Sequence, residues 1–229
     1  TLQYVITEPE ELTITADESN ISCNGAADGS IDITVTGGTG VYTYNWNNGE
    51  TTEDIINGWA YTYYVYIEDE NGCSISAGFE ITEPEAMAIS ETHTNISCFG
   101  ENDGASDVTV TGGTPPYTFE WSNGSDTEDV FDLGVGTYSV TATDNVGCSI
   151  SIAFEITEPE ELEISVAATN VSCNGGSDGS IDITVTGGDG DYSFYWDNAV
   201  TDYNPNQGAQ EDVSSLGSGV FTVIVSDGN

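Results

Sequence analysis

Five cysteines, placed at regular intervals, are the residues in this sequence whose type and spacing could do chemistry. They are Cys23, Cys73, Cys98, Cys148 and Cys173. The first, third and fifth recur at an offset of 75 residues, and so do the second and fourth. No two lie close enough to form the Cys-x-x-Cys pairs that bind zinc. Regular cysteines in small modules are instead typical of disulfide bonds in a secreted, oxidised protein.

Two disulfide pairings are open. A bond inside each repeat would join Cys23 to Cys73 and Cys98 to Cys148. It would close a loop of about 50 residues and stabilise the fold by roughly 4 kcal/mol through chain entropy. A bond between neighbouring repeats would join Cys23 to Cys148. If a repeat has six strands that alternate in direction, the two turns that carry its cysteines lie at the same end, which favours the internal bond. If it has seven strands, these turns lie at opposite ends, which favours the bond between repeats. We favour the internal bond.

Acidic residues recur with the same period and suggest a second chemistry. Calcium binds clustered oxygen ligands, and acidic surface modules can hold it at junctions such as the Glu-Pro-Glu segments here. The candidate ligands are Asp28, Asp103, Asp178, Asp69 and Asp144. The spacing of an EF-hand does not occur, and Asp-Gly turns on a solvated acidic face explain the same pattern. We favour the turn interpretation and keep Ca²⁺ as the alternative.

Catalysis by paired carboxylates is the remaining option. Such a pair can hydrolyse a glycosidic bond, but among 40 Asp and Glu residues many pairs fall at a suitable separation by chance. Acidic positions that recur three times suit a scaffold better than one catalytic centre. His93 is the only histidine, and the sequence offers no base to activate a nucleophile. We therefore expect no enzymatic function and no cofactor beyond the calcium alternative.

The charge balance excludes several classes of partner. The sequence has no Lys and no Arg, and its net charge is −40. Nothing in it could neutralise phosphates, so nucleic acid is excluded, and anionic lipid surfaces recruit basic clusters that are missing here. No apolar run is long enough to span a bilayer, so we expect no direct membrane insertion. Self-repulsion should be relieved by salt or bound cations.

The elements that position these residues belong to three copies of one module. The stretch 20–38 returns at 95–113 and at 170–188, and a Thr-Glu-Pro-Glu segment precedes each copy. We expect repeats at 8–82, 83–157 and 158–229, which we call the first, second and third repeats. The third has an insertion near 199–208 and lacks its last strand.

Residues 1–7 match the last strand of a preceding repeat. Either the chain is a window on a longer array, or this strand completes the third repeat of another subunit by donor-strand exchange. We favour the window, because exchange would leave Cys173 without the partner that internal pairing gives it.

The hydrophobic pattern predicts an all-β fold. Short stretches such as 31–36 and 42–46 alternate apolar and polar residues between Gly-Gly and Asn-Gly turns. Tyr138 follows a turn in the manner of the tyrosine corner of immunoglobulin-like sandwiches. We expect tandem immunoglobulin-like β-sandwich modules, joined by stiff proline linkers and arranged as an extended rod. The predicted core of the first repeat is Ile31, Ile33, Val35, Tyr42, Tyr44, Trp46, Tyr63, Val65, Ile67, Ile75, Phe79 and Ile81.

Two departures from the repeat are candidate ligand or partner surfaces. In the first repeat, exposed aromatic side chains could stack on sugars or pack against another chain; they are Trp59, Tyr61, Tyr64 and Tyr66. In the third repeat, the insertion could serve recognition, as loops on a rigid scaffold often do, through Tyr203, Asn204 and Gln207. A cross-strand tyrosine ladder and a neutral loop extension explain the same residues without a ligand.

Several motifs at fixed spacing resemble the SprB repeat. They are Ser-Cys-Asn-Gly-x-x-Asp-Gly-Ser-Ile, Val-Thr-Gly-Gly-x-x-x-Tyr-x-[Tyr/Phe]-x-Trp, Gly-Thr-Tyr-x-Val-Thr-x-Thr-Asp and Gly-Cys. That family builds long cell-surface adhesins of gliding Bacteroidetes, exported by the type IX secretion system. The resemblance implies an extracellular, adhesive filament role. Its partners would be other repeats of the same chain, identical chains in a filament, or a surface polysaccharide bound by the first-repeat aromatics.

Overall fold

The computed structural model describes residues 2–197 and 211–228, and all regular elements in these ranges are β-strands. Within the same residues no helix is long and apolar enough to cross a membrane. By its contacts the chain divides into two compact units. The first comprises Thr1–Ser90, Val108–Glu128 and Ser139–Ile152, and the second comprises Glu91–Asp107, Asp129–Tyr138 and Ala153–Asn229. The second repeat therefore contributes residues to both units.

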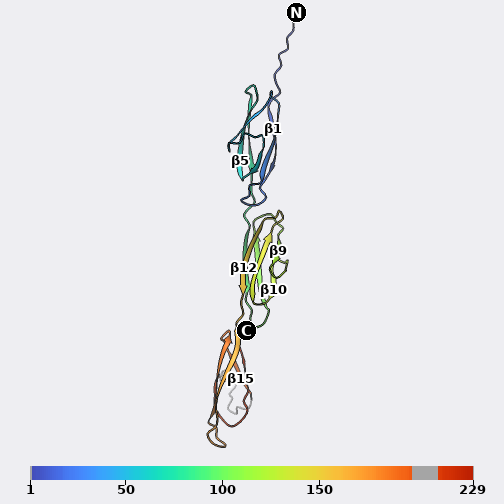
Figure 1. The fold of residues 1–229 in the computed structure, drawn as a ribbon. Helices are drawn as coiled ribbons and strands as arrows, with labels where there is room; N and C mark the ends of the chain where they lie inside the picture. The colour runs from blue at the N-terminus through green and yellow to red at the C-terminus, as the bar shows by residue number, and fades with distance from the viewer. Residues whose placement is uncertain (1, 198–210, 229) are drawn as a thin grey trace. The chain divides into compact units, whose positions relative to one another are not determined.

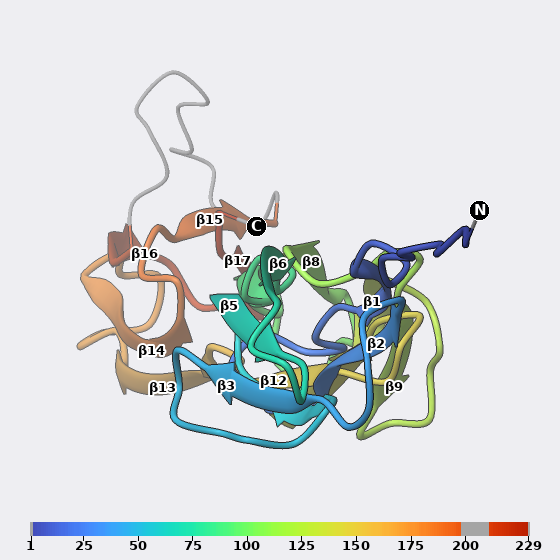
Figure 2. The ribbon, with the colours of Figure 1, turned by 90° about the horizontal axis from the view of Figure 1, so that it is seen from above.

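The first repeat is a sandwich of two antiparallel three-stranded sheets (Figure 1). One sheet has the order β1-β2-β4, and its strands are Thr13–Ser19, Gly29–Thr36 and Ile55–Gly58. The other has the order β3-β5-β6, and its strands are Thr43–Trp46, Tyr61–Glu68 and Ser74–Ile81. Figure 2 shows β1 beside β2 and β5 beside β6 in a view turned by 90°.

The other repeats use the same strand order. In the second repeat the sheets are β10-β8-β7 and β12-β11-β9, built from β7 (Ala88–Thr94), β8 (Gly104–Thr111), β9 (Thr118–Trp121), β10 (Val130–Leu133), β11 (Gly136–Thr143) and β12 (Ser149–Ile156). In the third they are β13-β14-β16 and the two-stranded β15-β17, built from β13 (Glu160–Thr169), β14 (Gly179–Gly188), β15 (Ser193–Trp196), β16 (Val213–Leu216) and β17 (Val223–Ser226).

Alternating side chains build the core between the two sheets. In β2, Ile31, Ile33 and Val35 face inward, and in β5 Val65 and Ile67 do the same. Every residue of the predicted core lies in the buried cluster or packs directly against it. The prediction missed three buried members, and these are Leu12, Ile21 and Ile55.

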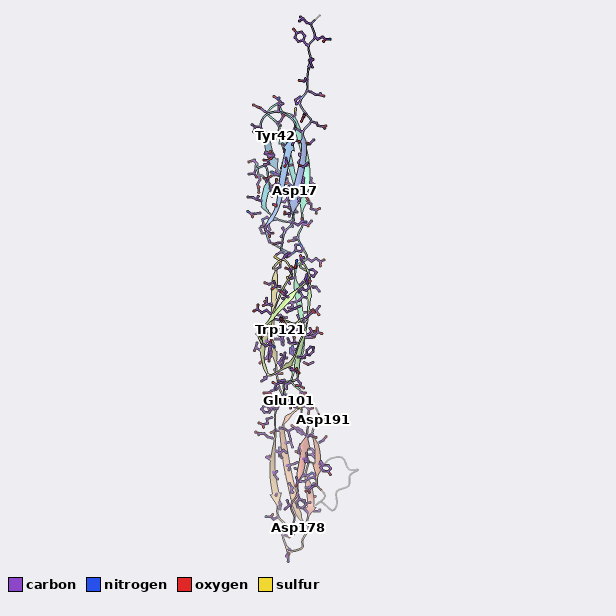
Figure 3. The ribbon with its side chains drawn as sticks, turned by 90° about the vertical axis from the view of Figure 1, so that its right-hand side faces the viewer. Asp17, Tyr42, Glu101, Trp121, Asp178 and Asp191 are labelled. Atoms are coloured by element: carbon purple, nitrogen blue, oxygen red, sulfur yellow. A yellow bond between two sulfur atoms is a disulfide. The ribbon has the colours of Figure 1, made fainter. Side chains whose placement is uncertain are left out.

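Hydrogen bonds of the aromatic side chains fix the sandwich. Trp46 is 2% exposed, and its Nε1 donates to the Thr52 carbonyl oxygen at 2.9 Å. Its counterpart in the second repeat, Trp121, is labelled in Figure 3 and is also buried. The tyrosine corner is confirmed, because Tyr138 Oη donates to the Gly134 carbonyl oxygen, four residues upstream, at 3.0 Å. The modules are thus immunoglobulin-like sandwiches, as the sequence predicts.

The strand directions give each repeat two distinct ends. Strands β1, β2, β5 and β6 run the full length of the sandwich. Strands β3 and β4 each cover half of it: Trp46 at the end of β3 lies opposite Val65 in the middle of β5, and Ile55 at the start of β4 lies opposite Ile31 in β2. Both run in the same direction, so together they make a single pass from one sheet to the other.

This arrangement overturns the internal disulfide. Because β3 and β4 do not alternate in direction, the β1–β2 loop and the β5–β6 turn lie at opposite ends of the repeat. We call the end with the β5–β6 turn, where the chain enters the repeat, the leading end. We call the end with the β1–β2 loop, where β6 leaves, the trailing end. Cys23 lies at the trailing end and Cys73 at the leading end, so the expected bonds Cys23–Cys73 and Cys98–Cys148 are not formed.

Candidate functional site: a cysteine loop that clamps the linker

The β1–β2 loop, residues 20–25, binds the linker that leaves the first repeat. Asn20 Oδ1 accepts a hydrogen bond from the backbone N–H of Thr82 at 2.8 Å. The next residue of the loop, Ile21, donates its N–H to the Thr82 carbonyl oxygen at 3.0 Å. The Ile21 side chain is only 5% exposed and closes the end of the core. The loop therefore holds Thr82 through both of its backbone polar groups.

The loop also binds the two residues that follow Thr82. Asn24 Nδ2 donates to the carbonyl oxygen of Pro84 at 3.0 Å, and the N–H of Gly25 donates to Glu83 Oε2 at 2.8 Å. Gly25 has a φ of +77°, in the left-handed region that favours glycine. This conformation lets the loop turn while its N–H points at the carboxylate. We call residues 20–25, together with their bonds to residues 82–84, the linker clamp.

A carboxylate shapes the clamp from within. Asp28 accepts hydrogen bonds from the Ser22 N–H, at 3.1 Å, and from the Ser22 hydroxyl. The hydroxyl bond and then the N–H bond lower the pKa of Asp28 below its ordinary value, because both favour the charged carboxylate. The same pair of bonds lowers the pKa of Asp103 and of Asp178 in the other repeats. These three carboxylates hold the cysteine loops in shape.

The second repeat forms the same clamp with the linker that follows it. Asn95 Oδ1 accepts from the N–H of Thr157 at 2.9 Å, and the N–H of Ile96 donates to the Thr157 carbonyl oxygen at 3.0 Å. The N–H of Gly100 donates to Glu158 Oε2 at 2.9 Å. Phe99 stands where the first repeat has Asn24, so here the side-chain bond to the proline carbonyl has no donor. The motif that recurs most clearly in the sequence is thus a linker-binding motif.

One disulfide joins the clamp of the first repeat to the leading end of the second. Cys23 and Cys148 are bonded, with their Cα atoms 5.7 Å apart and a sequence separation of 125. Closing a loop of this length stabilises the folded state by about 5 kcal/mol in the chain-entropy account. The other three cysteines are free thiols, with Cys73 and Cys173 exposed and Cys98 partly buried.

A second carboxylate supports the turn that carries the other cysteine. Asp69 is 4% exposed, and its Oδ1 accepts hydrogen bonds from the N–H groups of Asn71 and Cys73 at 3.0 and 2.8 Å. Its Oδ2 accepts from the N–H of Thr39 at 2.9 Å. A Cβ on Gly38 would lie 2.9 Å from this oxygen, so a larger residue there would displace the carboxylate.

The same turn recurs in the second repeat around Asp144. This residue is 5% exposed and accepts from the N–H groups of Thr114, Val146 and Cys148 at 2.8, 3.0 and 2.9 Å. Burial alone raises the pKa of Asp144, but the hydrogen bonds outweigh it, so the pKa lies below its ordinary value. Burial would likewise raise the pKa of Asp69, but its hydrogen bonds lower it below the ordinary value. Both cysteine turns are therefore held by a buried, ionised carboxylate.

These contacts account for the five calcium candidates. Each of Asp28, Asp103, Asp178, Asp69 and Asp144 is bound to N–H groups of its own loop or turn. In the described ranges, no group of three or more His, Cys, Asp or Glu side chains is placed to hold a metal ion. The turn interpretation therefore explains their positions without a cation.

The aromatic candidates of the first repeat are exposed, but they do not form one surface. Trp59, Tyr61, Tyr64 and Tyr66 are 61%, 55%, 59% and 44% exposed. Only Tyr64 and Tyr66 line a shallow groove of about 510 Å³ on the β3-β5-β6 sheet, together with polar groups such as Asn45, Asn47 and Ser76. Across this sheet Tyr64 lies opposite Gly78, whose missing side chain makes room for the ring. Tyr203, Asn204 and Gln207 lie outside the described residues.

The fold and the clamp together define a class of protein: a tandem array of immunoglobulin-like sandwiches whose neighbours are tied by hydrogen bonds and a disulfide. A family model of the SprB repeat matches residues 15–51, 90–126 and 165–201. Each match begins in the first strand of a repeat and includes its cysteine loop and its buried tryptophan. The chain therefore contains three SprB repeats.

Immunoglobulin-domain arrays are among the solved structures to which the chain is similar. The N-terminal eight immunoglobulin domains of Down Syndrome Cell Adhesion Molecule match over 95% of this chain and 45% of that one, with 11% identity and a TM-score of 0.42. Sidekick-1 immunoglobulin domains 1–5 match over 83% and 48%, with 11% identity and a TM-score of 0.39. The chain spans less than half of either structure. No curated protein matches the sequence.

Removing the Asn95 side chain should loosen the second linker clamp. In Asn95→Ala the N–H of Thr157 loses its acceptor, which should cost about 1 kcal/mol and reduce the hydrogen-exchange protection of this amide about fivefold. Asn102→Ala changes an exposed asparagine of the same connection and serves as the control. Equal protection in both variants would contradict the clamp.

The cysteine turn of the second repeat should weaken only in acid. The pKa of Asp144 is lower in the folded chain than in the unfolded one, so its carboxylate stabilises the fold above the unfolded pKa of about 3.9. This contribution is lost as the pH falls through the lower folded pKa. We expect the protection factor of the Cys148 amide to fall in that window.

Asp144→Asn separates this effect from the general loss of negative charge in acid. The variant should show a lower protection factor for the Cys148 amide at neutral pH. Its further decrease in acid should be smaller than that of the parent chain. Parallel pH profiles for the two proteins would contradict the role of Asp144.

Proposed function

We propose that this chain is a structural and adhesive segment of a long secreted filament on a bacterial cell surface, similar to the SprB-type adhesins of gliding bacteria that the type IX system exports. The family match and the immunoglobulin-like repeats support a repeat region of this kind. Its role is to connect and present other parts of the filament rather than to catalyse a reaction. The acidic groups that recur in every repeat serve loops and turns, which supports this assignment.

The observation that carries the proposal is the covalent joint between the first two repeats. A filament that transmits force needs connections that resist extension. Here the Cys23–Cys148 bond and the linker clamp bridge the same joint, in parallel with the peptide chain. With no lysine in the sequence, Lys-Asn isopeptide crosslinks are excluded, so mechanical strength depends on sheets and disulfides.

A groove on the first repeat favours a second candidate function, binding of a surface polysaccharide. Tyr64 and Tyr66 present aromatic faces beside the amide of Asn45, and sugars are bound by this combination of stacking and hydrogen bonding. The tyrosine pair belongs to the first repeat, because Ser139 and Thr141 occupy these positions in the second repeat and Thr222 and Ile224 occupy them in the third.

Stretching single molecules tests the structural role. With the disulfide intact, the residues between Cys23 and Cys148 cannot be extended when the chain is pulled from its ends. Breaking the bond should release about 420 Å of additional contour length, from 125 residues at about 3.3–3.6 Å each. Cys148→Ser should show the longer extension without reductant. An oxidised parent chain that extends as far as the variant would contradict the proposal.

Affinity chromatography tests the second candidate. On a column that carries a polysaccharide retained by the parent chain, Tyr64→Ala should abolish retention, because the Tyr64 ring supplies the stacking surface. Trp59→Ala is the matched control, since Trp59 is equally exposed but lies outside the groove. Equal loss of retention in both variants, or none in either, would contradict a sugar site at this groove.

A further inference from the structure

The linker clamp of the first repeat contains an exposed Asn-Gly pair. Asn24 and Gly25 both lie in solvent, and a Cβ added to Gly25 would meet no atom within 4 Å. In such a pair the backbone nitrogen of the glycine can attack the side-chain amide carbon of the asparagine, because glycine has no side chain to hinder the attack. The product is a succinimide ring, and its hydrolysis gives aspartate or isoaspartate.

A carboxylate lies where this reaction needs a base. The N–H of Gly25 donates to Glu83 Oε2 at 2.8 Å, so the proton that the attacking nitrogen must lose already points at an acceptor. A general base works from about 2.6–3.2 Å, and Glu83 meets this condition. The leaving group, Nδ2 of Asn24, donates to the carbonyl oxygen of Pro84 at 3.0 Å. The linker therefore holds both reacting groups of the pair.

Three Asn-Gly pairs in tight turns lack such a base. They begin at Asn48, Asn71 and Asn123, and in each the N–H of the glycine donates to a backbone carbonyl oxygen, at 2.9, 3.0 and 2.9 Å. A carbonyl oxygen accepts a hydrogen bond but is too weak a base to take the proton. Asn48 and Asn123 are as exposed as Asn24, so they are internal references for the uncatalysed reaction.

The second repeat has the base but lacks the asparagine. The N–H of Gly100 donates to Glu158 Oε2 at 2.9 Å, and the φ of Gly100 is +79°, close to the +77° of Gly25. Phe99 stands at the position of Asn24 and offers no amide carbon to attack. The second clamp therefore has the same loop and the same carboxylate but no reactive side chain.

We propose that the first linker clamp deamidates itself at Asn24, with Glu83 as the base, and so loosens its own hold on the linker. Glu83 takes the proton of Gly25 as the glycine nitrogen forms a bond to the side-chain amide carbon of Asn24. The bond from this carbon to Nδ2 then breaks, Glu83 passes the proton to the departing nitrogen, and ammonia leaves. Water opens the succinimide, so the reaction needs no oxidant and no second enzyme.

The product no longer fits the clamp. Aspartate has no N–H to donate to the Pro84 carbonyl oxygen, and it adds a negative charge beside Glu83 in a chain without Lys or Arg. Isoaspartate also lengthens the backbone of the loop by one methylene group, next to Cys23. The Cys23–Cys148 bond is not touched by the reaction. The joint between the first two repeats therefore becomes looser without coming apart.

Peptide mapping after incubation at neutral pH tests the reaction. The oxidised 229-residue chain is sampled over time, and aspartate and isoaspartate are measured at positions 24, 48 and 123. We expect position 24 to react fastest. Glu83→Gln keeps an oxygen that can accept the Gly25 N–H but cannot take its proton, so it should slow the reaction at position 24 at least about tenfold and leave position 123 unchanged. Faster reaction at position 48 or 123 in the parent chain, or no effect of Glu83→Gln, would overturn the proposal.

A gain of reactivity in the second clamp is the complementary test. Phe99→Asn supplies the missing amide beside Gly100 and Glu158, and it should create a new site of deamidation at position 99. Phe99→Gln is the matched control, because its amide carbon lies one bond further from the attacking nitrogen, and it should stay intact over the same time. An unreactive Phe99→Asn variant, or equal rates in the two variants, would contradict the role of Glu158 and with it that of Glu83.

Hydrogen exchange tests the loosening. In the deamidated fraction, the amide of Thr82, which the same loop binds, should exchange about fivefold faster than in the unreacted chain, as expected for the loss of one hydrogen bond. The amide of Thr157 in the unmodified second clamp is the control and should not change. Equal exchange of Thr82 before and after the reaction would show that the clamp does not depend on Asn24.

Discussion

The joint between the first two repeats depends on the two hydrogen bonds between the β1–β2 loop and the backbone of Thr82. A disulfide needs Cα atoms within about 4.4–6.8 Å of each other. Cys23 meets this condition toward Cys148 because Asn20 and Ile21 of the same loop are bonded to Thr82, where the linker to the second repeat begins. Each hydrogen bond contributes only about 1 kcal/mol. Together they fix where the linker begins, and the position of the cysteine follows from that.

The absence of basic residues makes backbone N–H groups the partners of the structural carboxylates. Asp69 binds three of them, Glu83 binds that of Gly25, and Asp54 binds that of Ile33 at 3.0 Å. Hydrogen bonds from N–H groups to a carboxylate are among the stronger ones in proteins. They let a chain with no lysine or arginine bury ionised groups at defined places. Most of the other acidic residues that the structure describes are exposed to solvent.

Local sequence was sufficient to predict the sandwich but not the disulfide. Alternation in the stretches that became β2 and β5 identified the core, because the side-chain period of a strand is a local property. The pairing of Cys23 depended on whether β3 and β4 alternate in direction. The Asn-Gly turn at residues 48–49 suggests a hairpin, yet the chain crosses there from the β3-β5-β6 sheet to the β1-β2-β4 sheet. No local sequence pattern predicts this crossing. In the same way the repeated Asn20 and Asn24 were visible as a motif, but their partners lie about 60 residues away.

The disulfide between the first two repeats also changes the effect of cleaving a single peptide bond. The bond between Cys23 and Cys148 closes a covalent ring that contains most of the first repeat, the linker and most of the second repeat. Hydrolysis of any one peptide bond within that ring opens it but leaves both ends attached through sulfur. An extracellular protease that cleaves after Glu85 would therefore cut the linker without separating the repeats. The joint between the first two repeats is thus one that a single cleavage cannot sever.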